Sequence, residues 1–569
     1  MTTKLDLVLM WHMHQPDYRE YATGRYTQPW VYLHALKDYS DMAAHLERHT
    51  RVHAVVNLVP VLLDQLEDYA EQYASGDIRD PLLALLRRDE ERPLEAAERA
   101  LIAERCFAAH HEKMVEPYPP YKRLLEMHRL FDAYGKEGMS YLSDRYFYDL
   151  LVWYHLAWTG ETVRRDSALI ARLMSEGSDF TLEDRRALFD LVGQVIAGVV
   201  PRYAALARDG RIELTTTPHF HPLAPLMLDF ASAREARPTF PLPAAHQYPG
   251  GHARVQFHID SAMREHARRF GSAPAGVWPA EGAVSSAFVD LVGRAGAAWT
   301  VSSEAVLAQS LQAGRTIKIA EEWAAQRGEL LYLPWRPRDN GPVMFFRDDR
   351  LSDLIGFEYA KWHSRDAALN FIAELDGIAT RAAANRTPLV SVILDGENCW
   401  EYYPYNGFYF LEALYAALEA HPSIRTTTFN DVVRDGVHPP APLERLVAGS
   451  WVHGDFGTWI GSHDKNLAWD LLAAAKQSVD LVIDSGRLSA TEREAALRQL
   501  ASCESSDWFW WMGDYNPPES VAMFDRMYRA NLAHLYALLK LPAPHTLSQP
   551  ISRGGGHPET GGTMRRANS

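Results

Sequence analysis

The sequence predicts an α/β fold in which parallel strands form a barrel, with a helical insertion and a C-terminal helical domain. Short apolar, β-rich runs recur along the chain, and polar or aromatic residues follow each of them. Helical patterns separate most of these runs, and strands that alternate with helices pair in parallel. Seven or eight such units favour a barrel over an open sheet, and barrels carry their chemistry at the carboxyl ends of the strands.

The predicted strands are continuous apolar runs, as expected when helices cover both faces of a parallel sheet. Helical periodicity in 284–296 and 366–385 is typical of the crossovers between such strands. The runs, each with the polar residues that follow it, are 5–16, 52–60, 212–222, 275–282, 297–304, 343–348, 389–397 and 424–429.

Two further segments are helical rather than alternating. Residues 61–205, with stretches such as "LLDQLEDYAEQYA", are predicted as an insertion between the second and third strands of a catalytic barrel that spans 1–435. Residues 440–545 are predicted as a C-terminal helical domain that completes the site. Residues 546–569 are rich in Gly, Ser and polar residues, which favours a disordered tail.

The bulk composition excludes several classes of protein. The 569 residues carry a net charge of −15 without a basic patch in the body of the chain, so nucleic acid is an unsuitable partner. Three separated cysteines form no disulfide framework, which fits a reducing compartment. The N-terminal apolar run is too short for a signal peptide, and no run is expected to span a membrane. We therefore expect a cytoplasmic protein; the oligomeric state stays open.

Carboxylates follow two of the predicted strands. Asp395 and Glu397 share a face if their strand continues that far, because side chains alternate along a strand. Glu281 lies between Trp278-Pro279 and Gly282, on a stiff and tight element, and a ring beside a carboxylate suits a sugar subsite. The alternative for Asp395 and Glu397 is an acidic loop at the rim, and the alternative for Glu281 is a glutamate that begins a helix. Two positioned carboxylates are what glycoside hydrolysis requires.

Histidines occur in two spaced pairs. His12 and His14 in "WHMHQP", and His219 and His221 in "TTTPHFHP", each face one side if the backbone is extended. These histidines allow three interpretations: they are hydrogen-bonded to the backbone or exposed at the rim, they bind a metal ion, or they recognise sugar hydroxyls. The last is reasonable because imidazole supplies both a donor and an acceptor. Neither Asp17 nor Glu213 completes a standard ligand motif. We expect no metal.

These stretches together resemble glycoside hydrolase family 57, across residues 12–400. The resemblance implies an incomplete (β/α)7 barrel followed by a helical domain, and a retaining reaction on α-glucans without a metal or cofactor. It assigns the nucleophile to Glu281 in "WPAEG" and the acid/base to Asp395 in "ILDGENCW". It also implies substrate contacts in "HMHQP" and "IELTTTPHFHP", from His12, His14, Gln15, Glu213 and His221.

The region after residue 450 resembles the amylopullulanase-like and α-amylase-like branch of that family. "GSWVHGDFGTWIGSHDKNLAWD" and "SCESSDWFWWMGDYN" are the stretches that carry this likeness. Their aromatic rings either attach the helical domain to the barrel or close over the glucan. With Trp278 and Trp400, we expect Trp459 and Asp464 to contact substrate.

The expected activity is therefore a retaining glycoside hydrolase on α-1,4 links, with α-1,6 links as an extension. The first alternative is a 4-α-glucanotransferase or branching enzyme on the same scaffold. A metal-dependent polysaccharide deacetylase is less favoured, because the first strand ends His-Met-His-Gln and lacks an Asp-Asp pair. A non-catalytic glucan-binding protein is less favoured because both carboxylates are present.

Overall fold

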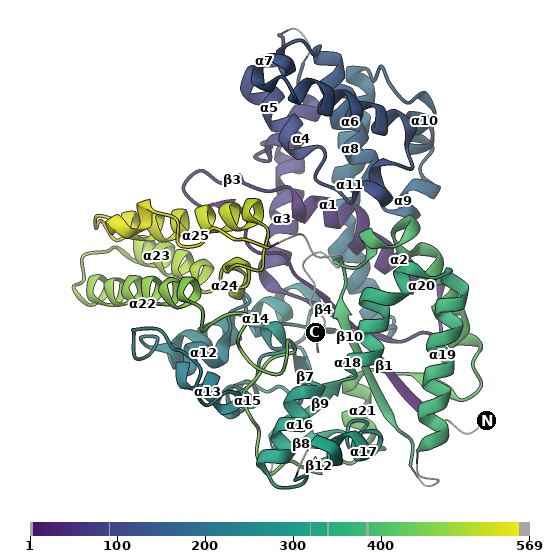
Figure 1. Ribbon diagram of the computed structural model, residues 1–569, viewed down its shortest axis with the longest axis vertical. Coiled ribbons are helices and arrows are strands. Elements are labelled where there is room, and N and C mark those ends of the chain that lie inside the picture. The colour runs from purple at the N-terminus through teal and green to yellow at the C-terminus, as the bar shows by residue number, and fades with distance from the viewer. Residues whose placement is uncertain (1–3, 90–91, 319, 338–340, 383–385, 557–569) are drawn as a thin grey trace.

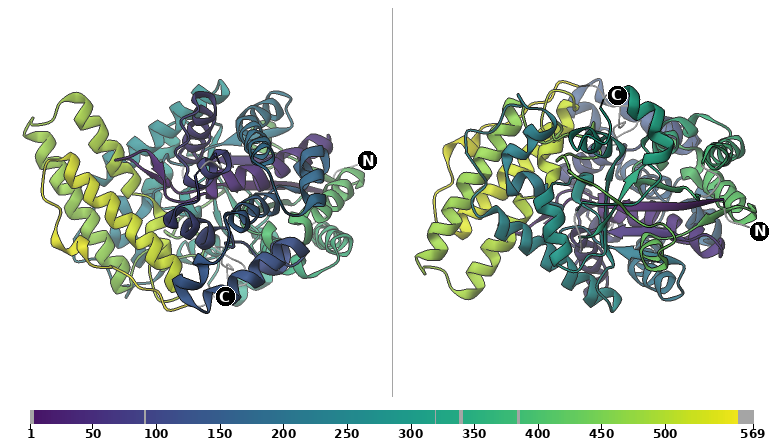
Figure 2. Two further views of the ribbon diagram at one scale, coloured as in Figure 1. Left: turned by 90° about the horizontal axis from the view of Figure 1, so that it is seen from above. Right: turned by 90° about the horizontal axis from the view of Figure 1, so that it is seen from below.

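Two parallel sheets lie at the centre of the computed structural model, which describes residues 4–89, 92–318, 320–337, 341–382 and 386–556 (Figure 1). Helices of the insertion lie at one end of the long axis, and the C-terminal helices lie on one flank (Figures 1 and 2). The predicted α/β class with parallel strands is confirmed.

The strands pair in two groups. The first sheet has the order β10-β1-β4-β5, with β11 also on β1, and the second has the order β12-β8-β9-β7-β6. Within them only the β8–β9 pair is antiparallel among the described strands. Their bounds are β1 Leu5–Met13, β4 Ala54–Leu58, β5 Ile212–Thr215, β6 Gly276–Val277, β7 Trp299–Ser303, β8 Trp335–Arg336, β9 Val343–Arg347, β10 Leu389–Asp395, β11 Ile424–Thr426 and β12 Ala441–Pro442; a short hairpin pairs β2 Arg19–Glu20 with β3 Arg25–Tyr26.

The alternation of β1 explains how the core positions the site. Val8 and Met10 belong to a small core that includes residues from both sheets, whereas Leu7, Leu9 and Trp11 pack in the larger core with the helices. All nine residues of β1 are buried, and each such aliphatic side chain contributes about 1.5–3 kcal/mol by leaving water. His12 continues the face of Val8 and Met10, so it lies at the carboxyl end of the strand on the side between the two sheets.

Helices surround these strands. Three short helices lie between β1 and β4, and the other helices separate the later strands. Several of them begin with Pro, Ser, Thr or Asp, residues that favour the first turn of a helix. They are α1 Trp30–His34, η1 Ala35–Tyr39, α2 Ser40–Arg48, α12 Ala224–Leu228, α13 Ala233–Ala236, α14 Gly251–Phe270, α15 Ser286–Arg294, α16 Glu304–Ala313, α17 Ala320–Leu330, α18 Asp349–Asp353, α19 Ser364–Arg381, α20 Phe408–Ala420 and α21 Phe429–Asp435.

The insertion between β4 and β5 is helical. Its elements are α3 Pro60–Ser75, α4 Pro81–Arg87, α5 Ala96–Arg105, η2 His111–Val115, α6 Pro119–Asp132, α7 Gly135–Ser140, α8 Asp144–Ala157, α9 Glu161–Asp166, α10 Ala168–Glu176 and α11 Leu182–Arg208. By length and composition α11 alone, among the described helices, is apolar enough to cross a membrane, which corrects the expectation that no segment comes near that limit. Its buried residues pack against α3 and α4, as a core helix does.

The C-terminal helices are α22 His463–Asp484, α23 Ala490–Cys503, α24 Ser506–Trp511 and α25 Pro518–Leu538. The prediction of a disordered tail was wrong for residues 546–556. Ile551 is buried, and its backbone N–H and that of Ser552 donate hydrogen bonds to Asp525 Oδ1 at 2.7 and 3.2 Å. Composition missed this because the segment is held by tertiary hydrogen bonds, from Asp525 and Arg529 of α25 and from the loop before that helix. Residues 557–569 lie outside the described part of the chain.

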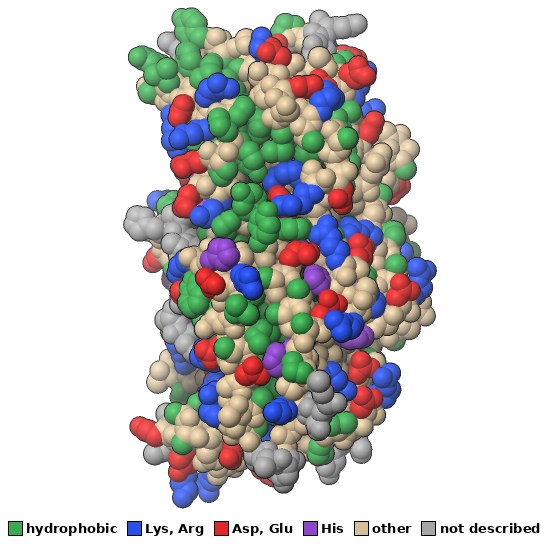
Figure 3. Space-filling view, turned by 90° about the vertical axis from the view of Figure 1, so that its right-hand side faces the viewer, with side chains coloured by type: hydrophobic (Ala, Val, Ile, Leu, Met, Phe, Trp, Pro, Cys, Tyr) green, Lys and Arg blue, Asp and Glu red, His purple; other side chains and the backbone are tan. Residues whose placement is uncertain are grey.

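The surface shows no separation of charge on the face seen in Figure 3. Acidic and basic side chains are interspersed there, with hydrophobic side chains among them. This mixing agrees with a modest net charge spread over a chain of this length.

Candidate active site

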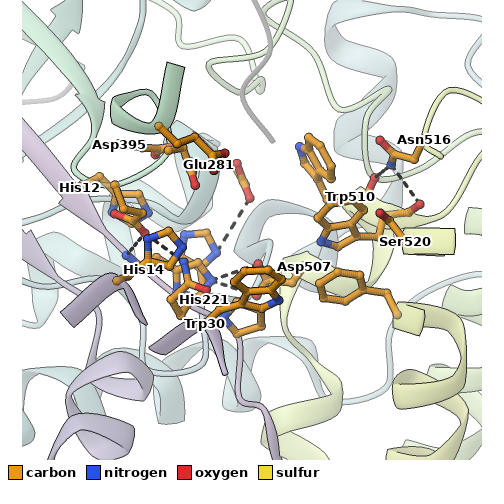
Figure 4. Close-up of a pocket in the computed structure, with 18 of the residues that line it drawn as sticks. His12, His14, Trp30, His221, Glu281, Asp395, Asp507, Trp510, Asn516 and Ser520 are labelled. Atoms are coloured by element: carbon orange, nitrogen blue, oxygen red, sulfur yellow. Dashed lines mark hydrogen bonds and ion pairs between the residues drawn. The ribbon is translucent and has the colours of Figure 1, made fainter. Parts of the chain in front are cut away.

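A pocket of about 670 Å³ opens where the strands of the two sheets, the insertion and the C-terminal helices meet (Figure 4). That volume suits a ligand of several rings. Its lining combines carboxylates, histidines and aromatic rings from segments far apart in the sequence. The residues used below are His12, His14, Gln15, Trp30, Trp158, His221, Glu281, Arg347, Asp395, Glu397, Trp451, Asp507, Trp510, Trp511 and Phe524.

Glu281 lies on a 3₁₀ turn directly after β6. Its φ of 59° is in the left-handed region, which is rare for a residue with a side chain and marks a strained, positioned group. Trp451 Nε1 donates to Glu281 Oε2 at 3.1 Å, and Ser506 Oγ donates to Oε1 at 3.2 Å. Burial raises the pKa of Glu281, and the charges of Asp507 and Asp395 raise it further.

Asp395 is the last residue of β10, paired in register with His12 of β1. Asn398 Nδ2 donates to Asp395 Oδ2 at 2.7 Å. Burial raises the pKa of Asp395 to about 6, although the Asn398 hydrogen bond opposes it. The strand ends at Asp395, so the shared strand face expected for Asp395 and Glu397 is not formed. Glu397 Oε1 instead accepts the backbone N–H of His14 at 3.1 Å.

Three of the predicted histidines gather beside these carboxyl groups. The rings of His12 and His221 stack with centroids 5.2 Å apart, and those of His14 and His221 lie 3.8 Å apart. Asn57 Oδ1 lies 2.6 Å from His12 Nδ1. Burial, with the neighbouring His14, lowers the pKa of His12 to about 3 and that of His221 well below its usual value. Both rings are therefore neutral donors and acceptors at pH 7.

The second histidine pair does not share a face. β5 ends at Thr215, and His221 has a φ of 56°, so the backbone turns between the two rings. His219 Nε2 lies 3.0 Å from Asp64 Oδ2, outside the pocket lining. The two prolines around the pair, Pro218 and Pro222, remove N–H donors and so oppose a continued strand.

Several predicted substrate-contact residues lie outside the pocket lining, whereas Gln15 lies in it. Glu213 accepts from Trp299 Nε1 at 2.7 Å and from the Asn430 backbone at 2.9 Å, well before the end of its strand. Trp400 Nε1 donates to Gly396 O at 3.0 Å and so secures the loop after Asp395. The other such residues are Trp278, which packs edge-on against Trp451, Trp459, which is fully buried, and Asp464 in the first turn of α22. Their positions indicate packing and structural roles.

Sequence reasoning missed the three-residue segment that begins α24. The Ser506 backbone N–H donates to His221 O at 2.9 Å, and Ser506 Oγ lies 2.9 Å from His221 Nδ1. Asp507 Oδ2 lies 2.9 Å from His14 Nε2, and Ser505 Oγ donates to Asp507 Oδ2 at 2.5 Å. The run "DWFWW" drew attention to its rings, two of which line the pocket, whereas the polar residues at and just before its start contact the histidines and Glu281.

Arg347 and two aromatic groups complete the pocket. Arg347 is the last residue of β9 and lies over the Trp451 ring at 5.9 Å. At one end of the pocket the rings of Trp30 and Trp158 are 5.7 Å apart, and at another Trp511 stacks on Phe524 at 4.4 Å. Aromatic faces next to acidic groups bind the apolar faces and hydroxyls of a sugar at little entropic cost.

The fold and this site define an enzyme that breaks or transfers glycosidic bonds. The profile of Glycosyl hydrolase family 57 matches residues 8–444, and the chain belongs to this family. Among curated proteins no sequence matches.

Solved structures of similar fold span nearly the whole chain. The branching enzymes of this family from Thermococcus kodakaraensis and Pyrococcus horikoshii each align at 13% identity and a TM-score of 0.56, covering 94% and 96% of this chain and 90% and 96% of their own. The alpha-amylase from Thermotoga maritima aligns at 13% identity and a TM-score of 0.54, covering 95% of this chain and 93% of its own. At this identity the likeness concerns the fold.

Proposed function

We propose that the protein is a retaining enzyme on α-glucans, with Glu281 as the nucleophile and Asp395 as the acid/base. The observation that carries the proposal is that both carboxyl groups face one pocket whose lining also includes histidines and aromatic rings. The printed names of the similar structures, branching enzymes and an alpha-amylase, support an α-glucan as the substrate.

In the first step Glu281 attacks the anomeric carbon while protonated Asp395 gives its proton to the departing glycosidic oxygen. The glycosidic C–O bond breaks, and an ester bond between the sugar and Glu281 forms. In the second step Asp395 removes a proton from water or from an acceptor sugar, whose oxygen displaces Glu281. The pKa of Asp395 is raised to about 6 and that of Glu281 to about 8, so the two carboxyl groups together hold about one proton near pH 7, and the first step requires that proton on Asp395.

Hydrolysis of α-1,4 links, extending to α-1,6 links, is the primary activity that we propose. Transfer to a sugar acceptor is the second candidate, and the aromatic lining of the pocket favours it. Trp30, Trp158, Trp510 and Trp511 line the pocket and offer ring faces to a second sugar chain.

We also propose that the seven strands β1, β4, β5, β6, β7, β9 and β10 form the incomplete barrel of the family. Two contacts between the sheets support this proposal: a parallel bridge joins Thr216 to Val277, and Asp348 N–H donates to Ser391 O at 2.8 Å. A cytoplasmic location is proposed as well, because all three cysteines are buried and unpaired.

The deciding experiment combines product analysis with the stereochemistry of the first product. Maltoheptaose and pullulan are incubated separately with the protein, and the new reducing ends are followed by ¹H NMR. We expect the α-anomer first, because two displacements restore the original configuration. Shorter products alone indicate hydrolysis, and a ladder of longer and shorter products indicates transfer. First appearance of the β-anomer, or full activity of Glu281→Gln, would refute the assignment of the nucleophile.

A further inference from the structure

We propose that His14, His221 and Asp507 form a binding site for one divalent metal ion of the zinc class at the base of the pocket. The candidate ligand atoms of these three residues all lie within 4.8 Å of one another. Two imidazole nitrogens and one carboxylate are a donor set that zinc accepts, with a fourth position left for water. Figure 4 shows the three side chains pointing toward one another beside Glu281.

The hydrogen-bond pattern leaves one ring nitrogen ready for a metal. Ser506 Oγ donates its only proton to Glu281 Oε1, so it accepts a hydrogen bond from His221 Nδ1–H. The proton on Nδ1 places the lone pair on His221 Nε2. That nitrogen is buried and has no hydrogen-bond partner among the described residues. An imidazole held by its other nitrogen, with a free and buried lone pair, is how proteins orient a metal-binding histidine.

The second and third ligands already contact each other. His14 Nε2 lies 2.9 Å from Asp507 Oδ2, and the Ser505 hydroxyl holds that same carboxylate oxygen at 2.5 Å. Zinc holds ligand atoms at about 2.0–2.2 Å, so the widest gap between ligands must close by on the order of 1 Å. The rings of His14 and His221 are stacked, with centroids 3.8 Å apart and an angle of 18° between their planes, so one ring must rotate out of the stack before both lone pairs point to the ion.

The site was hidden in the sequence because its ligands come from three distant segments. His14 follows β1, His221 follows β5, and Asp507 lies in α24 of the helical domain. Metal motifs in sequence depend on close spacing, which is absent here. The open pocket supplies the path by which the ion enters.

A metal ion at this place would occupy the space of the sugar next to Glu281. His221 Nδ1 is 3.9 Å from Glu281 Oε1, so an ion on His221 adds positive charge close to the nucleophile. We therefore expect zinc to inhibit the enzyme in competition with glucan. This consequence depends on the proposed function, whereas binding of the ion does not.

The experiment measures binding separately from activity. Chelator-treated, dialysed protein is titrated with Zn²⁺ by calorimetry and with Co²⁺ by visible absorption, and one ion per chain is expected. His221→Gln and Asp507→Asn should each weaken binding by more than about 100-fold, and Ser506→Ala by about 10- to 100-fold, because Ser506 only orients His221. Circular dichroism verifies that each variant folds, and X-ray absorption of the wild-type zinc complex should show two imidazole nitrogens.

Two matched controls locate the ion. His246→Gln removes an exposed histidine, and His49→Gln disrupts a second cluster in which His49 contacts Glu412 and Glu419. Both should bind Zn²⁺ as the wild type does. Loss of binding in His49→Gln with retention in His221→Gln would overturn the proposal, as would the absence of imidazole ligands in the wild-type spectrum. If glucan turnover is absent altogether, the titrations still decide whether the metal site exists.

Discussion

Replacement of Glu504 by Gln tests how the C-terminal helices are held against the α/β part of the molecule. Glu504 follows α23 and is fully buried. Its carboxylate accepts from Arg254 Nε and Nη2 at 2.8 and 2.7 Å, from His258 Nε2 at 2.7 Å and from Tyr248 Oη at 2.5 Å. Arg254 and His258 lie on α14, between β5 and β6, so one carboxylate connects the C-terminal helices to the α/β part of the molecule.

The magnitude follows from two independent arguments. Burial alone raises the pKa of Glu504, but the charge of Arg254 and the hydrogen bonds of His258 and Arg254 outweigh it and lower the pKa from 4.5 to about 2. A difference of roughly 2.5 pKa units corresponds to about 3 kcal/mol of folding free energy. Removal of one partner of a buried ion pair costs about 3–5 kcal/mol, which agrees with the value obtained from the pKa difference. We expect Glu504→Gln to lose about 3 kcal/mol at pH 7.

The sign of the pH dependence is set by the lowered pKa. A carboxylate whose folded pKa is depressed stabilises the protein fully above its unfolded pKa, near 4.5, and loses that contribution as the pH falls toward 2. The difference between wild type and variant should therefore shrink on acidification below 4.5.

Urea denaturation followed by tryptophan fluorescence at pH 7 and pH 4 measures this difference. Activity should also fall, by about 10- to 100-fold, because Ser506 and Asp507 follow Glu504 directly and a shift near 1 Å in a positioned group has such an effect. Glu494→Gln, on the exposed face of α23, is the control and should change stability by less than about 0.5 kcal/mol. A Glu504→Gln variant as stable as the control at pH 7, or a difference that grows on acidification, would refute the reasoning.

Three further predictions concern the pocket. Trp451→Phe keeps an aromatic ring but removes the N–H that donates to Glu281. Loss of this hydrogen bond should remove about 1.5–3 kcal/mol of transition-state stabilisation and lower kcat/KM roughly 10- to 150-fold. An effect on KM alone would contradict this prediction. Asn398→Ala removes a hydrogen-bond donor to ionised Asp395, so the pKa of Asp395 should rise about one unit above 6. Because Asp395 acts as an acid in its protonated form, the limb of the pH–rate profile that it sets should move to higher pH. A limb that does not move would contradict this prediction. Trp30 lines the pocket, and we expect its ring to bind a sugar beyond those next to the carboxylates. Trp30→Ala should therefore lower kcat/KM for maltoheptaose more than for maltotriose, and equal losses on both would count against this role.

The two carboxylates that we propose as catalytic could be singled out from the sequence because each one lies next to a local pattern. Asp395 ends an apolar strand, and Glu281 sits between Pro279 and Gly282, so a short window carries the information. Glu213 shows the limit of such windows. Its neighbours resemble a substrate-binding stretch, yet its side chain is buried against Trp299 below the end of the strand. A short stretch of sequence does not show whether a side chain lies at the carboxyl end of a strand or inside the sheet.

The sequence by itself determined the class of the fold, the order of its strands and helices, and the chain segments that end at the site, because apolar periodicity and strand ends are local properties. Only the tertiary structure decided which groups meet. His14, His221 and Asp507 converge because parallel strands place their carboxyl ends together and because Glu504, deep in the protein, holds the start of α24 against that edge. Contacts between residues nearly five hundred positions apart depend on how the two parts of the molecule pack, and such packing has no counterpart in any short stretch of sequence.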